Sequence, residues 1–181
     1  VGHVTREPQP NDRRRVLVVP QQSSVAKAMS ALMPMIMGTN SVLEEFGEIF
    51  NHPKLHDVIL CAHNGKEFDF PWIARRFLIN GMQPPKPFQM FGKKPWEIPH
   101  LDTMELWKFG DYKSYISLEL LAHVFGIPTP KDDIDGSMVS SIYYIEKDLF
   151  RIVQYCEKDV LTLANIFRRM RQEELLERKT D

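Results

Sequence analysis

The sequence has few cysteines and no long hydrophobic run. Its two cysteines, Cys61 and Cys156, are too few for a disulfide framework, and neither has a neighbour at zinc-ligand spacing. The longest apolar stretches, 16–19 and 58–62, are far shorter than the roughly 18 residues that a membrane-spanning helix requires. No stretch has the pattern of a secretory or transit segment. We therefore expect a soluble, cytoplasmic protein with no membrane partner.

No sign of charge dominates the chain. Its 23 lysines and arginines against 24 acidic residues give a formal net charge of −1, so a nucleic-acid partner would need a local basic patch. With 43% hydrophobic and 26% charged residues, the composition is that of a globular protein and excludes wholesale disorder. A length of 181 residues predicts a single domain, 1–181.

The pattern of apolar residues predicts an α/β fold. Val58 to Ala62 is a continuous apolar run, typical of a strand buried on both faces. Helical spacing follows directly at 72–78 and ends near Asn80-Gly81, and a strand that leads straight into a helix indicates α/β architecture. The other expected elements are an edge hairpin of 1–5 and 15–19, a helix with Asn40 or Ser41 as its N-cap, a proline-rich loop at 84–99, a short strand at 99–102, and helices at 117–125, 137–144 and 150–171.

A first group of polar residues, His63 to Asp69, follows the most apolar predicted strand. Ligands of open α/β sheets collect at the carboxyl ends of strands, so Asp69 is well placed for function. Asp69 is equally a good N-cap before Phe70-Pro71, and Asn64 is equally a loop residue that bonds the backbone. His63 could reach a phosphate, with a structural role at the strand end as the alternative.

A second group, Tyr155 and Asp159, lies in the last predicted helix. A spacing of four places the hydroxyl and the carboxylate on one helix face, where both can reach one water or ion. A partly buried tyrosine beside a solvated aspartate is the alternative interpretation.

Elsewhere, Asp102 is interpreted as an N-cap, with polar support under a site as the alternative. Several lysines and arginines, with Phe88, Phe91 or Trp96 as stacking surfaces, are weaker candidates for a single-strand groove.

Together the two groups resemble the DEDD superfamily of 3′-5′ exonucleases. Asn64-x-x-x-Phe68-Asp69 is similar to the second motif of that superfamily, and Tyr155-x-x-x-Asp159 to the third motif of its tyrosine-containing branch, which includes the proofreading domains of family B DNA polymerases. The resemblance extends over 1–170 and also includes 100–106, 126–128 and 135–137, which are similar to stand-alone bacterial proteins related to those domains. It implies a ribonuclease H-like mixed sheet flanked by helices.

The resemblance also implies roles for individual residues. Asp69 and Asp159 would bind two Mg²⁺ or Mn²⁺ ions, and Tyr155 would orient the nucleophilic water. Asn64 would lie near the terminal nucleotide, and we take Phe68 and His63 as further substrate contacts. The partner would be a 3′ end of DNA or RNA, and the activity a two-metal-ion 3′-5′ exonuclease.

One motif of the superfamily, Asp-x-Glu on the first and central strand, has no counterpart here. The only acidic residues before Asn40 are Glu7 and Asp12, in a polar bend. We expect an upstream segment to supply this motif, with a natural inactive relative as the second interpretation. Two other functions stay open: a non-catalytic nucleic-acid-binding module of the same fold, and an α/β interaction domain in which Asp69 and Asp159 are ordinary caps.

Overall fold

The structure, a computed structural model, describes residues 16–18, 41–52, 55, 58–111, 113–128, 134 and 137–177. The expected strand at 1–5 and the acidic residues Glu7 and Asp12 lie outside this described part. Within it, no helix is both long enough and apolar enough to cross a membrane.

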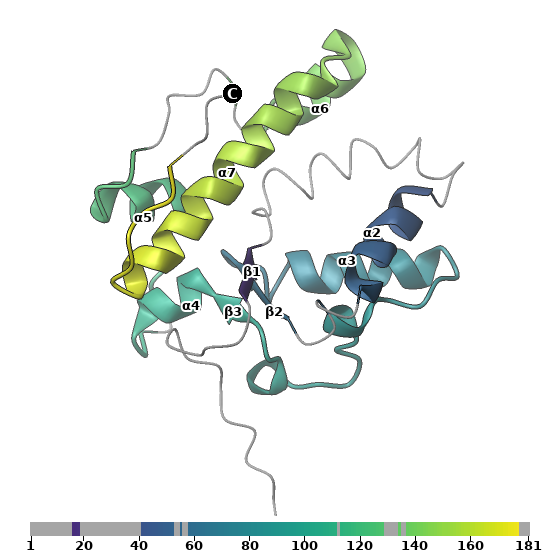
Figure 1. Cartoon of the computed structure of the whole chain (residues 1–181), viewed down its shortest axis with the longest axis horizontal. Helices are drawn as coiled ribbons and strands as arrows, with labels where there is room; N and C mark the ends of the chain where they lie inside the picture. The colour runs from purple at the N-terminus through teal and green to yellow at the C-terminus, as the bar shows by residue number, and fades with distance from the viewer. Residues whose placement is uncertain are drawn as a thin grey trace, which may run out of the picture.

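A small parallel sheet forms the centre of the fold (Figure 1). Its strands are β1 (Val16–Val18), β2 (Ile59–Ala62) and β3 (Leu101–Asp102), in the order β1-β2-β3. The strands predicted at 58–62 and 99–102 are therefore confirmed, the second as a two-residue strand. Between consecutive strands the chain crosses over through helices, so the α/β class is confirmed as well.

The first strand pairs with the central strand, and the hairpin predicted between 1–5 and 15–19 stays a prediction because 1–5 lies outside the described residues. A strand is present within 15–19, but its partner in the described part of the chain is β2, in parallel, with Val16 opposite Ile59. The resemblance implied a mixed sheet, whereas all strand pairing among the described residues is parallel. The local apolar pattern indicated a strand correctly and carried no information about a partner more than 40 residues away.

Helices cover both faces of the sheet. On one face, Leu60 and Ala62 pack with Leu43 and Phe50 of α2 (Ser41–Asn51) and with residues of α3 (Asp69–Ile79). On the other, Ile59, Cys61 and Leu101 pack against Phe167 of α7 (Leu149–Met170). All four side chains of β2 are buried, which explains its continuous apolar sequence. Burial raises the pKa of the Cys61 thiol, and the nearby Asp102 carboxylate raises it further, so this thiol stays protonated.

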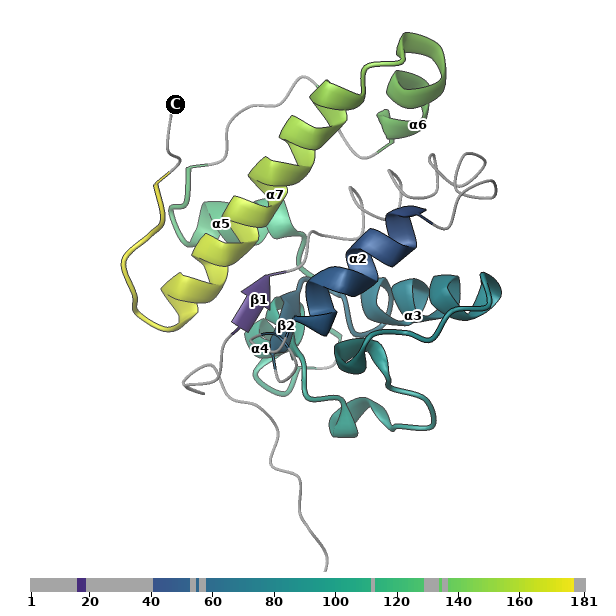
Figure 2. The same cartoon turned by 45° about the vertical axis from the view of Figure 1, so that its right-hand side comes forward.

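The remaining elements surround this core. The proline-rich loop contains two short turns, η2 (Lys86–Phe88) and η3 (Pro95–Glu97), and β3 leads directly into α4 (Thr103–Lys108). The helix predicted at 117–125 is α5 (Leu118–Val124), with Ser117 as its N-cap. The helix predicted at 137–144 is a single turn, α6 (Val139–Ser141), continued by a π-helical segment, η4 (Ile142–Glu146). The long final helix is confirmed as α7, which packs on α5 and passes β1 (Figure 2).

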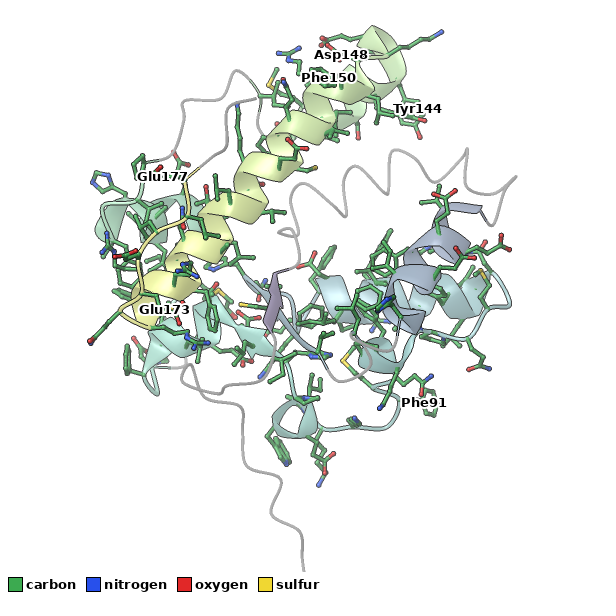
Figure 3. All side chains as sticks on the ribbon, viewed as in Figure 1. Phe91, Tyr144, Asp148, Phe150, Glu173 and Glu177 are labelled. Atoms are coloured by element: carbon green, nitrogen blue, oxygen red, sulfur yellow. The ribbon has the colours of Figure 1, made fainter. Side chains whose placement is uncertain are left out.

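Phe88 is a core residue and not a stacking surface. Its side chain is fully buried, and its ring contacts the rings of Phe46, Phe50 and Phe70. The suggestion that it stacks on a base is therefore wrong. Phe91, by contrast, is 97% exposed and projects from the loop (Figure 3), but this loop precedes β3 and so lies at the amino edge of the sheet.

His100 is a buried histidine whose ring joins the sheet to the loop. Its Nδ1 accepts a hydrogen bond from Leu60 N at 3.3 Å, and its Nε2 lies 2.6 Å from the carbonyl oxygen of Pro87, to which it must donate. Burial lowers the pKa of His100 to about 4. The ring is therefore neutral at pH 7, with its hydrogen on Nε2.

Because the unfolded state binds a proton near pH 6.5 and folded His100 binds one only near pH 4, stability falls as the pH drops through this window. We expect the free energy of unfolding to fall by roughly 2 kcal/mol between pH 6.5 and 5, at about 1.4 kcal/mol per unit. Urea titrations at several pH values measure this slope. His100→Gln should make the slope shallower without abolishing it, because the buried, neutral His63 contributes in the same direction, and His123→Gln, which removes an exposed histidine of α5, is the control. An unchanged slope in His100→Gln would contradict the assignment.

Candidate active site

The turn between β2 and α3 holds Asn64 in an unusual backbone conformation. Asn64 has φ = 61°, in the left-handed region that asparagine tolerates better than most residues. Its backbone N–H donates to Oδ1 of Asp102 at 2.9 Å. Its side-chain Oδ1 is buried and has no hydrogen-bond partner in the part of the chain that the structure describes. The asparagine side chain is thus held at the carboxyl end of β2 with a buried acceptor atom that no described residue satisfies.

Asp69 is a buried carboxylate at the first position of α3. Its side chain is 2% exposed, and Phe68, 37% exposed, occupies the N-cap position. The interpretation of Asp69 as the N-cap is therefore wrong, because the helix begins at Asp69 itself. The position still favours a negative charge, since the partial positive charge of a helix N-terminus lies there.

Gly65 allows the turn to pass close to Asp69. A Cβ atom at position 65 would lie 2.2 Å from Cβ of Ala62 and 3.4 Å from Oδ2 of Asp69. The Gly65 carbonyl also accepts a hydrogen bond from Phe70 N at 2.9 Å, which ties the turn to the first turn of α3. Only glycine fits between the end of β2 and the Asp69 carboxylate.

Tyr155 and Asp159 lie on the inner side of α7. Tyr155 is half-buried and packs against the cluster of Ile134, Val139, Ile142 and Ile152. Asp159 is also half-buried, and its Oδ2 is inaccessible to solvent. Its burial is therefore partial, and both interpretations of the Tyr155 and Asp159 pair stay predictions.

Tyr155 and Asp159 lie nearer the start of α7 than the residue by which this helix contacts the sheet. Phe167 packs on the sheet, and Asp159 and Tyr155 lie 8 and 12 residues earlier, so at 1.5 Å per residue they are about 12 and 18 Å nearer the start of α7. Figures 1 and 2 show these earlier turns beyond the part of α7 that lies beside α4 and α5. That Asp69 and Asp159 meet in one pocket stays a prediction.

His63 has a structural environment. Its side chain is 1% exposed, its Nε2 donates to the Ile116 carbonyl at 2.8 Å, and its Nδ1 lies 2.9 Å from the Thr103 hydroxyl. Burial is the main cause that lowers the pKa of His63, so the ring is neutral at pH 7. Both ring nitrogens face protein atoms, and these contacts favour the structural alternative over a phosphate contact.

Asp102 is more than the N-cap that the sequence predicted. Its carboxylate accepts from the backbone N–H groups of Met104 and Glu105, which caps α4, and also from those of Asn64 and Lys66. The Lys66 side chain forms a salt bridge of 2.8 Å with Glu105, which joins the same two segments. The sequence offered polar support as the alternative role of Asp102 but could not name the supported residues, because the contact joins two strand ends that are 40 residues apart.

Asp69 and Asp159 have the right ligand chemistry for a metal site, but two carboxylates are too few to hold two ions. Carboxylate oxygens such as those of Asp69 and Asp159 are the hard ligands that Mg²⁺ and Mn²⁺ prefer. However, no group of three or more histidine, cysteine, aspartate or glutamate side chains that could hold a metal ion occurs among the residues that the structure describes. Two ions would therefore need ligands in addition to these two residues.

A buried carboxylate and an asparagine at the carboxyl end of a central parallel strand define an α/β protein with a polar site at its sheet edge. The comparison with known families agrees with the resemblance: a family described as predicted 3′-5′ exonucleases related to the exonuclease domain of PolB matches residues 19–178. The chain belongs to this family. No curated protein and no solved structure matches the chain significantly.

Proposed function

We propose that this protein is a 3′-5′ exonuclease that hydrolyses the terminal phosphodiester bond of DNA or RNA with two Mg²⁺ or Mn²⁺ ions, provided that further acidic ligands, such as those of an Asp-x-Glu motif, complete the site of Asp69 and Asp159. Membership of the exonuclease family supports the activity. The single observation that carries the assignment to a site is the buried carboxylate of Asp69, at the start of the helix that leaves the central strand. A buried carboxylate at the end of a central strand is a candidate ligand for a hard divalent cation.

In this proposal Asp69 and Asp159 each bind metal through carboxylate oxygens. When bound, two divalent ions activate the attacking water and stabilise the leaving oxygen. The phenol of Tyr155, one helical turn before Asp159, orients the water by a hydrogen bond. Asn64 offers its buried amide oxygen as an acceptor for the terminal nucleotide, and the partly exposed ring of Phe68 provides a surface on which its base stacks. For His63 we propose only a structural role.

The polarity of degradation tests this function. With Mn²⁺ and the full chain, a 5′-labelled single-stranded oligonucleotide should shorten one nucleotide at a time, whereas a 3′-labelled one should release its label in the first step. Excess EDTA should stop both reactions. Release of the 5′ label first, or activity that persists in EDTA, would contradict the proposal.

One observation favours a second function, a non-catalytic nucleic-acid-binding module. The described residues contain no group of three potential metal ligands, and two carboxylates alone are a poor site for two doubly charged ions. A module of this kind would bind an oligonucleotide in a fluorescence anisotropy assay without shortening it. It would also show no uptake of Mn²⁺ by calorimetry that depends on Asp69 and Asp159.

A further inference from the structure

Asp102 accepts more hydrogen bonds than a helix cap requires. It is 2% exposed at the end of β3, and its carboxylate accepts four backbone N–H groups. Two of them, Met104 N at 3.0 Å and Glu105 N at 3.4 Å, belong to the first turn of α4. The other two, Asn64 N at 2.9 Å and Lys66 N at 3.2 Å, belong to the turn after β2.

The two carboxylate oxygens divide these bonds unequally. Among the residues that the structure describes, Oδ1 accepts from Met104, Glu105 and Asn64, and Oδ2 accepts from Lys66. The Asp102 side chain thus caps α4 and also holds the turn after β2. Hydrogen bonds to an ionised acceptor are roughly twice as strong as those between neutral groups. The turn needs such support, because Asn64 is in a left-handed conformation that a free chain seldom adopts.

A second contact joins the same strand ends. The Thr103 hydroxyl lies 2.9 Å from Nδ1 of His63 and 3.3 Å from the carbonyl oxygen of Ala62, and its one hydrogen can serve either of these two acceptors. Asp102 and Thr103 therefore fix residues on both sides of the point where β2 ends. The turn that follows, with Gly65 beside the Asp69 carboxylate, begins from a rigid edge.

We propose that Asp102 is a positioning residue of the exonuclease site. It fixes the turn that presents Asn64 and that places Gly65 against Asp69, and it touches neither substrate nor metal. The inference rests on the proposed function. Preorganised supporting contacts of this kind typically change activity by about 10- to 100-fold when they are removed.

Two substitutions separate capping from positioning. Asp102→Asn can keep Oδ1 for the cap while its amide NH₂ faces the N–H of Lys66, so only the bond to Lys66 is lost. Asp102→Ser keeps a good N-cap hydroxyl that is too short to reach the turn as well. We expect kcat to fall by about 10-fold or more in both variants, because the turn beside Asp69 is displaced, and KM to rise as well, because the same turn presents Asn64 to the substrate.

A matched control is the aspartate at the start of α7. Asp148 is also an N-cap, accepting from Arg151 N at 3.0 Å, but it is exposed at the far end of that helix (Figure 3). Asp148→Asn and Asp148→Ser should leave kcat unchanged. A second readout is hydrogen exchange of single amides: in Asp102→Asn the Lys66 amide should exchange faster, while the Met104 and Glu105 amides stay protected.

The outcomes distinguish this inference from the function on which it rests. Wild-type kcat in both Asp102 variants of an active protein would overturn the positioning role and leave the exonuclease assignment intact. Unchanged exchange of the Lys66 amide in Asp102→Asn would overturn it too. A wild-type protein that degrades no 3′ end under any metal would overturn the proposed function before any variant is compared.

Discussion

Asp69→Asn and Asp159→Asn should each reduce the rate of 3′-end degradation by more than about 100-fold, since loss of an outer-sphere partner of a metal already costs 10- to 100-fold. Asparagine keeps the shape of the side chain and removes the negative charge that a divalent cation requires. Release of a fluorescent nucleotide from the 3′ end, measured over a range of Mn²⁺ concentrations, gives this rate. Asp69 lies on α3 and Asp159 on α7. Similar losses of activity in the two single variants are therefore expected only if both residues serve one site.

The double variant tests whether they do. If Asp69 and Asp159 act as a unit, Asp69→Asn combined with Asp159→Asn should be about as slow as the slower single variant, because effects within one catalytic unit are strongly non-additive. Multiplied losses would indicate two independent contributions. Glu67→Gln and Glu157→Gln are matched controls, because each removes an exposed negative charge two residues away on the same segment. Controls as slow as the Asp variants would show that general charge, and not a site, is responsible.

Gly65→Ala should be strongly damaging to both stability and activity. The added Cβ would lie 2.2 Å from Cβ of Ala62, which belongs to the central strand and cannot move without displacing the sheet. Overpacking of a rigid interior typically costs about 1–3 kcal/mol. The relaxation must also shift the turn away from Asp69, whose Oδ2 would lie 3.4 Å from the new atom. Thermal unfolding and the nuclease assay measure the two effects separately.

Gly47→Ala is the control for this substitution. Gly47 lies inside α2, and a Cβ there would meet the Phe77 ring at 3.5 Å, an ordinary van der Waals distance. Because alanine is favoured over glycine in a helix interior by about 1 kcal/mol, Gly47→Ala should stabilise the protein and leave activity unchanged. If Gly65→Ala were equally harmless, the close approach between the turn and Asp69 would be wrong.

Much of the architecture follows from local patterns. A buried apolar run followed by a helical pattern indicated the strand at 58–62 and the α/β class, and the proline-rich loop and the helices at 117–125 and 150–171 followed from caps and breakers. The π-helical segment η4 was not predicted, because no residue pattern distinguishes it from the end of an α-helix. The parallel partner of β1 was also beyond local reasoning, since strand pairing depends on the whole fold.

In the candidate site, too, local features were predictable from the sequence and tertiary contacts were not. Residues 64, 69, 155 and 159 were found by their spacing and by their positions at the end of a strand and on a helix face. The sequence alone could not decide whether Asp69 was a cap, and the helix boundary excluded it. The second role of Asp102 depends on the distance between two strand ends, which no spacing encodes. Asn64 was interpreted as a possible loop residue, but the close approach of Gly65 to Asp69 is tertiary and was not predicted.

The parallel sheet also governs how this chain must fold. β1 meets β2 across residues 16 and 59, and β2 meets β3 across 61 and 101, so neither ladder can start from a hairpin. Each requires closure of a loop of about 40 residues before any strand pair gains stability, and such long closures slow folding. A fragment that stops before residue 101 has only one of the two ladders and lacks the anchor for the turn at Asn64. Truncation therefore cannot isolate the amino-terminal half as a working unit.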